Sequence, residues 1–401
     1  MLFSGFSATY KFAKYSSVRI LFCNIIFMRN CIGVSTRFKC TKVVSNSITK
    51  KKTTDEAPWR IIFFGSDDFS LASLKPLTAK LRTGTLLSEL GVVSSPGTIV
   101  HKFATDENLP IHEWPPATSI LQNYDLGMVV AYGKLIPAEM INSLPLGILN
   151  VHGSLLPRWR GAAPVEHAIM NGDTETGVTI FRIKPEKFDI GDIVRQYRCS
   201  IAPNETAVEV RTRLATFGAK LLLECVRDLP RCVTMATSQP SEGVSYAPKL
   251  TPSYAQLTWN NQTAQQVYNR HRALAHIHPL TTWWYGRPVR LQNISLAPVS
   301  QQTTFKPQNS TASSCKSALD FLNDIQPVNR ANSDSNSRPG RIKYSHKSKV
   351  LTIECADGAS VICDNLRVLQ KKMSATDFYN GFLSKVSEAD WVFGVQSREV
   401  G

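Results

Sequence analysis

The feature that most constrains the fold is an alternation of short apolar runs with helix-like stretches after residue 58. It begins with Trp59–Gly65, an apolar run that ends in glycine and is followed by polar residues and then by apolar residues at helical spacing. Further runs of strand character are Gly91–Ser95, Leu126–Ala131, Gly147–His152, Val178–Ile183 and Ile193–Ser200. Strands that alternate with helices predict an α/β domain with a Rossmann-like, doubly wound and largely parallel sheet.

Two features limit the classes of ligand that this domain can bind and indicate where the domain ends. Only Gly65 stands in the first turn, without a GxGxxG or GxxxxGK[ST] pattern, so no dinucleotide or triphosphate site is indicated. Farther on, Thr206–Glu209 fits a capping box, and apolar residues follow it at spacings of three and four up to Leu221. A long amphipathic helix is therefore expected to close a first domain that spans residues 58–232.

A second, smaller and β-rich domain is predicted after a linker. The linker is residues 233–252, which are rich in Thr, Ser, Gln, Pro and Gly. A helix near Asn261–Ala275 follows it. The strands expected are Thr281–Trp284, Pro288–Leu291, Lys349–Cys355 and Ser360–Cys363. We expect this domain to span residues 253–388, with a disordered polar insertion at 301–338 and a C-terminal tail at 389–401.

The basic charge of the chain is concentrated at its N-terminus. The chain has 46 Lys and Arg, 31 Asp and Glu and a formal charge of +15, but ten of the basic residues and none of the acidic ones lie in residues 1–54. Without that segment the formal charge is about +5. A basic, acid-free segment with Ser and Thr is typical of a mitochondrial transit peptide, which we expect at 1–54. The alternatives are a nucleic-acid-binding arm and a secretory signal built on Ile20–Met28, a run too short to span a bilayer.

The densest cluster of unusual residues is Gly147–Pro164, which reads GILNVHGSLLPRWRGAAP. Side chains alternate along a strand, so Asn150 and His152 are expected on one face while Leu149 and Val151 enter the opposite layer. Ligands of open α/β sheets bind beyond the carboxyl ends of the strands, which is where this pair lies. The sequence therefore predicts a functional site at this edge, and a strand-end histidine with a purely structural role is the alternative.

These residue types suit the transfer of a formyl group to an amine. That reaction needs a hydrogen-bond donor for the negative charge on the formyl oxygen, a base for the amine proton and a group that orients the base. Asn150 can donate, His152 can accept the proton and Asp189 can orient the ring, with Asp192 as the alternative carboxylate. No metal ion is required, and the nine cysteines form no CxxC pair that would indicate a zinc site.

The pattern Asn150-x-His152, Ser154-Leu155-Leu156-Pro157 and Asp189 resembles the signature of the 10-formyl-tetrahydrofolate-dependent formyltransferases. This resemblance implies that the Asn and the His act on the formyl group and that the Asp tunes the His. It also implies that the Ser-Leu-Leu-Pro stretch borders the folate. The implied co-substrate is 10-formyl-tetrahydrofolate.

The continuation of the pattern is similar to the branch of that family that formylates aminoacyl-tRNA. It consists of Arg158–Pro164 and Gly172–Ile180. The resemblance implies initiator methionyl-tRNA as the acceptor, mitochondrial translation initiation as the setting, and an OB-like second domain that binds tRNA. The tRNA contacts expected are Arg158, Arg160 and Lys249. We expect the chain to act as a monomer, away from membranes.

Two interpretations of the basic residues stay open. Trp159, between two arginines, can receive RNA, or it can be packed while one arginine pairs with a local carboxylate. A basic face on the second domain is either an RNA-binding surface or an ordinary solvated one. Its members are Arg287, Arg290, Arg341, Lys343, Lys347, Lys349, Arg367, Lys371 and Lys372.

Two other functions could use the same residues. The Asn-His-Asp set could serve hydrolysis of 10-formyl-tetrahydrofolate or formylation of a sugar amine, and the run Pro157–Pro164 and the basic second domain argue against both reactions. The chain could also be an RNA-binding protein with a degenerate catalytic fold. The joint presence of Asn150, His152 and Asp189 argues against that hypothesis.

Overall fold

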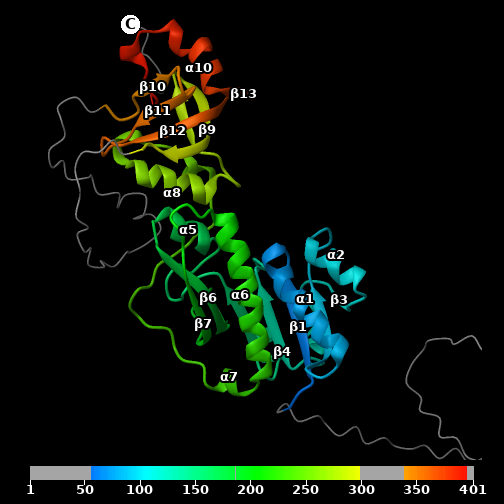
Figure 1. The fold of residues 1–401 in the computed structure, drawn as a ribbon. Helices are drawn as coiled ribbons and strands as arrows, with labels where there is room; N and C mark the ends of the chain where they lie inside the picture. The colour runs from blue at the N-terminus through cyan, green and yellow to red at the C-terminus, as the bar shows by residue number, and fades with distance from the viewer. Residues whose placement is uncertain (1–55, 186, 299–337, 395–401) are drawn as a thin grey trace, which may run out of the picture. The chain divides into compact units, whose positions relative to one another are not determined.

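The computed structural model describes residues 56–185, 187–298 and 338–394 and contains two β-sheets (Figure 1). The first sheet consists of β1 (Trp59–Gly65), β2 (Leu87–Val93), β3 (Ile111–His112), β4 (Leu126–Val130), β5 (Ile148–His152), β6 (Glu175–Arg182) and β7 (Ile193–Ser200). The order across this sheet is β3-β2-β1-β4-β5-β6-β7. The segment expected as a transit peptide lies outside the described residues, and so does the predicted insertion apart from Arg338.

This sheet is parallel on one side and antiparallel on the other. β1 pairs with β2 and β4, β2 with β3, and β4 with β5 in parallel, whereas β6 lies antiparallel to both β5 and β7. Parallel neighbours need a long crossover, and only residues 183–192 join β6 to β7. The prediction of a largely parallel, doubly wound sheet is confirmed for β1–β5, and β6 and β7 add an antiparallel edge.

The helices of the first domain are α1 (Asp68–Thr83), α2 (Ile99–Asp106), α3 (Thr118–Leu121), α4 (Ala138–Asn142), α5 (Pro164–Met170), α6 (Ala207–Arg227) and α7 (Arg231–Thr234). α6 starts at the predicted capping box, where the Thr206 N–H donates to Glu209 Oε2 over 2.8 Å and the Glu209 N–H donates to Thr206 Oγ1 over 3.4 Å. α1 and α6 pack side by side on one face of the sheet (Figure 1). The predicted long amphipathic helix is therefore confirmed.

Alternation along β5 divides its side chains between two layers of the core. Leu149 and Val151 lie in the layer that α1 and α6 cover. Ile148 belongs to the layer on the opposite face of the sheet. Since Asn150 and His152 share the parity of Ile148, both leave the strand on that second face, as the sequence predicts.

Part of the predicted linker is bound tightly to the first domain. Residues 245–247, which we call the strap, lie beside the loop that follows β5: the Arg160 N–H donates to the Ser245 carbonyl over 2.8 Å, and the Ala247 N–H donates to the Arg160 carbonyl over 2.7 Å. The Ala163 N–H donates to the Ala247 carbonyl over 3.2 Å. Gly161 has a φ of +130°, and a Cβ at this position would overlap the Ala247 carbonyl. The strap is therefore a part of the first domain, not a free spacer.

The second domain consists of α8 (Ala264–Leu274), α10 (Ala375–Gly381) and a six-stranded antiparallel sheet. Its strands are β8 (Thr281–Trp284), β9 (Arg287–Leu296), β10 (Ile342–Ser345), β11 (Val350–Glu354), β12 (Ser360–Val368) and β13 (Lys371–Ser374). The order is β10-β11-β12-β9-β8, and β13 pairs with β12. In the described part of the chain, no helix is long and apolar enough to cross a membrane.

Residues 391–394 join the two edge strands of this second sheet. The Ile342 N–H of β10 donates to the Trp391 carbonyl over 2.7 Å, and the Gly394 N–H donates to the Trp283 carbonyl of β8 over 2.9 Å. Trp391 and Phe393 are buried. The structure thus places residues 389–394 in the second domain and not in a tail, because their aromatic side chains complete its core. This segment covers both edges, as an OB-like barrel requires.

Replacing Gly161 with alanine is expected to loosen the strap. The new Cβ would meet the Ala247 carbonyl, and the positive φ adds backbone strain. We expect the free energy of unfolding to fall by about 2–4 kcal/mol. Denaturant unfolding measures this change, with Gly243→Ala as the control, because Gly243 has a φ of +76° but open space around it. Equal losses in both variants would mean that the contact with the strap contributes nothing.

Trp391→Ala is expected to destabilise the second domain by about 3–5 kcal/mol, because the change removes a buried indole that also donates a hydrogen bond to the Leu383 carbonyl over 2.9 Å. The measurement is thermal unfolding of the second domain. The control, Val386→Ala, shortens an exposed side chain and should stay within about 0.5 kcal/mol. An unchanged transition in Trp391→Ala would show that the segment behaves as a tail.

Candidate active site

Asn150 and His152 lie at the carboxyl end of β5, where they pair in register with Phe181 and Thr179 of β6. His152 is buried, with 6% of its surface exposed, and Asn150 is half-buried. Among the residues that the structure describes, the Asn150 amide has no hydrogen-bond partner. An amide can donate two hydrogen bonds, so Asn150 offers free donors at this edge of the sheet.

The ring of His152 is held in one orientation by the loop that follows its strand. Its Nε2 lies 2.8 Å from the Trp159 carbonyl oxygen. A carbonyl can only accept, so Nε2 carries the hydrogen and, in the neutral ring, Nδ1 is the nitrogen with a free lone pair. Nδ1 lies 3.9 Å from Asp189 Oδ2. A proton taken up at Nδ1 would thus lie next to a carboxylate.

Asp189 precedes β7 and is buried, with 8% of its surface exposed. Its Oδ2 accepts a hydrogen bond of 2.8 Å from the Gly161 N–H. Its backbone is left-handed, with a φ of +56°, and its carbonyl accepts a 2.8 Å hydrogen bond from Gln239 Nε2. Gln239 therefore fixes the backbone of Asp189, and the Gly161 N–H, in the loop after β5, fixes its carboxylate.

The alternative carboxylate, Asp192, has different partners. Its Oδ1 accepts hydrogen bonds from Lys184 Nζ over 2.7 Å and from Ser238 Oγ over 3.1 Å. The hydrogen bond from Lys184 lowers the pKa of the Asp192 carboxyl below its ordinary value. These contacts tie Asp192 to surface partners, and only Asp189 of the two has an ion-pair contact with His152 in the described residues.

The stretch Ser154–Pro157 is pinned from inside the domain. Ser154 is buried, and its hydroxyl donates to the Arg158 carbonyl over 2.7 Å. Leu156 is also buried, and its N–H donates to Thr179 Oγ1 over 3.0 Å. Leu155 and Pro157 are half-buried. Of the four residues predicted to border the folate, Leu155 and Pro157 thus present apolar surface, while Ser154 and Leu156 hold the loop.

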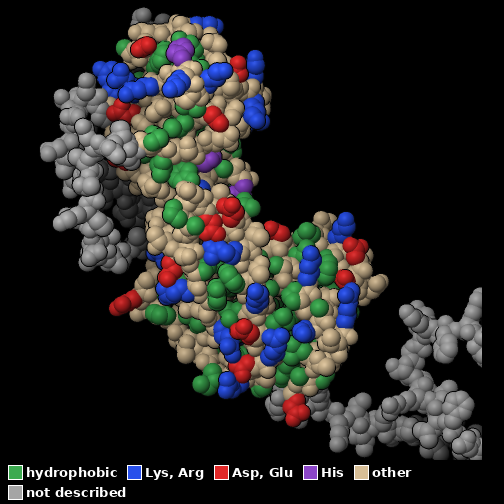
Figure 2. Space-filling view, viewed as in Figure 1, with side chains coloured by type: hydrophobic (Ala, Val, Ile, Leu, Met, Phe, Trp, Pro, Cys, Tyr) green, Lys and Arg blue, Asp and Glu red, His purple; other side chains and the backbone are tan. Residues whose placement is uncertain are grey.

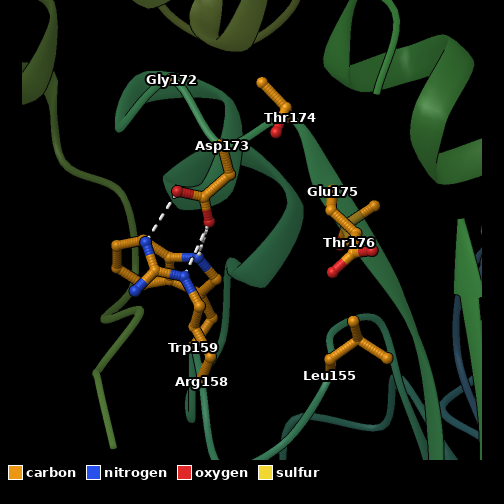
Figure 3. A pocket seen from close by; sticks show the side chains of 8 residues that line it. All are labelled: Leu155, Arg158, Trp159, Gly172, Asp173, Thr174, Glu175 and Thr176. Carbon is orange, nitrogen blue, oxygen red and sulfur yellow. Dashed lines mark hydrogen bonds and ion pairs between the residues drawn. The ribbon is translucent and has the colours of Figure 1, made fainter. Parts of the chain in front are cut away.

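Arg158 and Trp159 converge on one carboxylate, that of Asp173 in the turn before β6 (Figure 3). Arg158 donates from Nε to Oδ2 over 2.8 Å and from Nη2 to Oδ1 over 2.6 Å, and Trp159 Nε1 donates to Oδ2 over 2.7 Å. The Arg158 guanidinium also lies 4.5 Å from the centre of the Trp159 ring. Trp159 is buried, so the alternative in which the tryptophan packs and an arginine pairs locally describes this part of the loop.

Figure 3 shows the shallow pocket that these side chains line, which has a volume of about 380 Å³. Its other walls are Leu155 and the residues from Gly172 to Thr176. The Thr176 hydroxyl is buried there without a partner in the described structure. The pocket lies beside the loop that follows β5 and is open to solvent.

The other two residues predicted to contact tRNA differ in their surroundings. Arg160 donates to Gln239 Oε1 from Nε over 3.1 Å and from Nη2 over 2.7 Å. Lys249 is exposed and lies two residues after the strap. Lys249 is therefore free to reach a phosphate, whereas Arg160 is already engaged with the residue that holds Asp189.

Several residues that shape this site were not predicted from the sequence. Gln239 and Ser245 lie in a polar stretch of linker composition that carries no periodic signal. Thr179 and Gln196 lie on β6 and β7 and support the loop only because these strands pair, with Gln196 Nε2 donating to the Leu156 carbonyl over 2.9 Å. Within the described ranges, no group of three or more His, Cys, Asp and Glu side chains is arranged to hold a metal ion.

Comparison with known proteins assigns both domains. The profile of the formyl transferase family matches residues 118–226, and that of the formyl transferase C-terminal domain matches residues 249–383. Among solved structures, the sugar 3N-formyl transferase WlaRD superposes with a TM-score of 0.51 at 16% identity, over 79% of this chain and 100% of that one. An N-formyltransferase from Helicobacter canadensis superposes with a TM-score of 0.51 at 14% identity, over 76% and 98%. At these identities both structures show the shared fold alone.

Relatives at higher identity cover most of the chain. The mitochondrial methionyl-tRNA formyltransferase of Homo sapiens is 34% identical over 339 residues, which are 83% of this chain and 80% of the human protein. That of Mus musculus is 36% identical over 340 residues, with the same coverage. The methionyl-tRNA formyltransferase of Pseudoalteromonas translucida is 31% identical over 356 residues, or 84% of this chain and 96% of the bacterial protein. With both domains matched and these identities sustained over four-fifths of its relatives, the chain belongs to the methionyl-tRNA formyltransferase family of enzymes.

Proposed function

We propose that this formyltransferase moves the formyl group of 10-formyl-tetrahydrofolate to the α-amino group of methionine on initiator tRNA, in mitochondria. The observation that carries the proposal is the pair at the end of β5. Asn150 has unpartnered amide donors, and His152 has a single defined orientation with its free nitrogen towards Asp189. One group can stabilise an oxyanion and the other can move a proton, as formyl transfer requires.

His152 is the proton carrier in this proposal. An α-amino group has an ordinary pKa of roughly 7.7–8.0, so much of the acceptor is nucleophilic near neutral pH. As the amine nitrogen bonds to the formyl carbon, His152 takes the amine proton at Nδ1, since Nε2 already donates to Trp159. The Asp189 carboxylate, 3.9 Å away, stabilises the imidazolium, and His152 then gives the proton to the leaving nitrogen as the old C–N bond breaks.

Asn150 acts on the formyl oxygen. Negative charge grows on that oxygen when the carbon becomes tetrahedral, and the Asn150 amide can donate to it without breaking any bond within the described protein. Removing one donor of this kind typically costs about 2.7–4 kcal/mol of transition-state stabilisation. The folate supplies the activated formyl group, and the half-buried Leu155 and Pro157, in the loop after the strand of Asn150, offer it apolar contacts.

A row of like charges on the second domain supports the choice of tRNA as the acceptor. Arg367 on β12 lies directly opposite Arg290 on β9 and, on its other side, opposite Lys372 on β13. None of the three takes part in an ion pair among the described residues, and the Arg367 Nε is buried without a hydrogen-bond partner. Like charges opposite each other destabilise a sheet, and a bound phosphate removes that repulsion.

The N-terminal segment supports the compartment. Residues 1–54 combine ten basic residues with no acidic ones, and the mammalian relatives quoted above are mitochondrial proteins. We propose that these residues direct import. Expression of the chain with and without them, fused to a fluorescent reporter, tests the proposal, and mitochondrial import without residues 1–54 would contradict it.

Asn150→Ala and His152→Ala are expected to lower the rate of methionyl-tRNA formylation by about 100- to 1,000-fold, because each removes a group that acts only in the transition state. The assay follows labelled formyl transfer to methionyl-tRNA, beside water and a small sugar amine as competing acceptors. The affinity for tRNA should stay within about two-fold, since neither side chain belongs to the basic surfaces.

Asn123→Ala is the control for that experiment, because Asn123 is exposed and lies outside the site. A loss of tRNA affinity as large as the loss of formylation rate in the Asn150 and His152 variants would contradict the proposed roles. Preferred transfer to water or to the sugar amine by the unaltered enzyme would reject the tRNA acceptor itself.

Arg367→Gln is expected to weaken tRNA binding by about ten-fold and to reduce the slope of log affinity against log salt by about one. The matched control is Lys385→Gln, because Lys385 is an exposed cation of the same domain that does not belong to the basic face. Filter binding over a range of salt concentrations gives both quantities. An unchanged slope in Arg367→Gln would show that the row does not touch phosphate.

A further inference from the structure

Asp173 connects the surface of the catalytic domain to the candidate catalytic histidine. Its carboxylate accepts hydrogen bonds from both Arg158 and Trp159 (Figure 3). It accepts a further one from Asn171 Nδ2 over 2.9 Å. Trp159 is also the residue whose carbonyl accepts the hydrogen bond from His152 Nε2. One tryptophan thus contacts Asp173 with its side chain and His152 with its backbone.

Trp159 needs such support because its backbone conformation is unfavourable. Its φ is +61°, in the left-handed region that a bulky L-residue rarely adopts. Such strain persists only where surrounding contacts over-determine the conformation. Here the strap fixes the Trp159 N–H, which donates to Ser245 Oγ over 2.9 Å, and Asp173 fixes the indole.

We infer that Asp173 is a positioning residue that sets the tautomer of His152 through Trp159. This inference rests on the proposed role of His152 in formyl transfer. While the indole is held, the Trp159 carbonyl faces Nε2 and keeps the hydrogen there, which leaves the Nδ1 lone pair for the amine proton. When the indole is released, the carbonyl can turn away and the ring can place its hydrogen on Nδ1, towards Asp189. The ring then lacks a free lone pair on the side where the proton must be taken.

The geometry separates this role from a role in binding tRNA. Trp159 is only 4% exposed, so its contact with Asp173 is internal to the domain. The Arg158 side chain is partly exposed, with 43% of its surface accessible, and could serve both Asp173 and an RNA phosphate. Trp159→Phe removes the indole N–H and leaves Arg158 and Asp173 unaltered, so it isolates the positioning contact.

The test compares Asp173→Asn and Trp159→Phe with the unaltered enzyme. NMR of histidine labelled with ¹⁵N distinguishes a protonated Nε2 from a protonated Nδ1, and the signal of His152 is identified by its absence in His152→Ala. Spectra are recorded at alkaline pH, where an imidazole is neutral. We expect a single Nε2-protonated form in the unaltered enzyme and a mixture of the two tautomers in both variants. We also expect kcat to fall by about 10- to 100-fold, with KM for methionyl-tRNA within about two-fold.

Asn171→Ala is the control, because Asn171 donates to Asp173 but lies outside the loop after β5 that contains Trp159. It should match the unaltered enzyme in both spectrum and rate. Asp173→Glu retains the charge and is expected to recover part of kcat, and it also serves if Asp173→Asn does not fold.

An unchanged His152 spectrum in Trp159→Phe overturns the inference. So does a rise in KM with unchanged kcat in Asp173→Asn, which would assign Asp173 to tRNA binding through Arg158. The spectra are recorded without substrate, so they stand apart from the proposed function. If the unaltered enzyme failed to formylate methionyl-tRNA, the proposed function would fall while the tautomer shift could still be observed.

Discussion

The backbone hydrogen bonds between the strap and the loop after β5 hold the active edge of the catalytic domain together. Loops at the carboxyl ends of strands are among the least stable parts of a domain, yet this one must hold Trp159 in a left-handed conformation. Bonds from Arg160 and Ala163 to residues 245–247 supply the missing partners. Gly161 permits this approach, since a side chain there would meet the Ala247 carbonyl. The geometry at His152 therefore depends on residues that follow it by more than ninety positions.

Two carboxylates complete this arrangement, and both are satisfied within the protein. A buried carboxylate without partners is costly, so it persists only where hydrogen bonds replace its water. Asp189 receives the Gly161 N–H and faces His152 Nδ1. Asp173 receives Arg158 and the Trp159 indole. In the proposed mechanism Asp189 stabilises the charged histidine. The orientation of the neutral ring, which the sequence suggested as the role of Asp189, is assigned to Asp173 through the Trp159 carbonyl.

The local features of this protein could be predicted, and its long-range contacts could not. The period of two along β5 placed Asn150 and His152 on one face, and the capping box at Thr206 marked the start of α6, because both signals lie within a few residues. Gln239 and the strap lay in a polar stretch whose composition is that of a linker, and their partners, Asp189 and the loop after β5, are far away in sequence. Trp391 was assigned to a tail for a similar reason: its burial depends on two edge strands that are far away in sequence.

The two domains contribute to the proposed reaction through different interactions, hydrogen bonds in the catalytic domain and electrostatic interactions in the second domain. In the catalytic domain the His152 ring and the Asp189 carboxylate are each held by a hydrogen bond of 2.8 Å, so little reorganisation of these two groups is left for the transition state. On the second domain Arg290, Arg367 and Lys372 repel one another across three strands, and this repulsion weakens the empty sheet. A bound polyanion removes this repulsion, and the free energy gained adds to its affinity. Salt screens the attraction between the polyanion and these cations. If the proposed roles hold, tRNA binding should respond to ionic strength through the second domain. The chemical step, which we propose is set by His152, Trp159 and Asp189, should respond much less once the tRNA is bound.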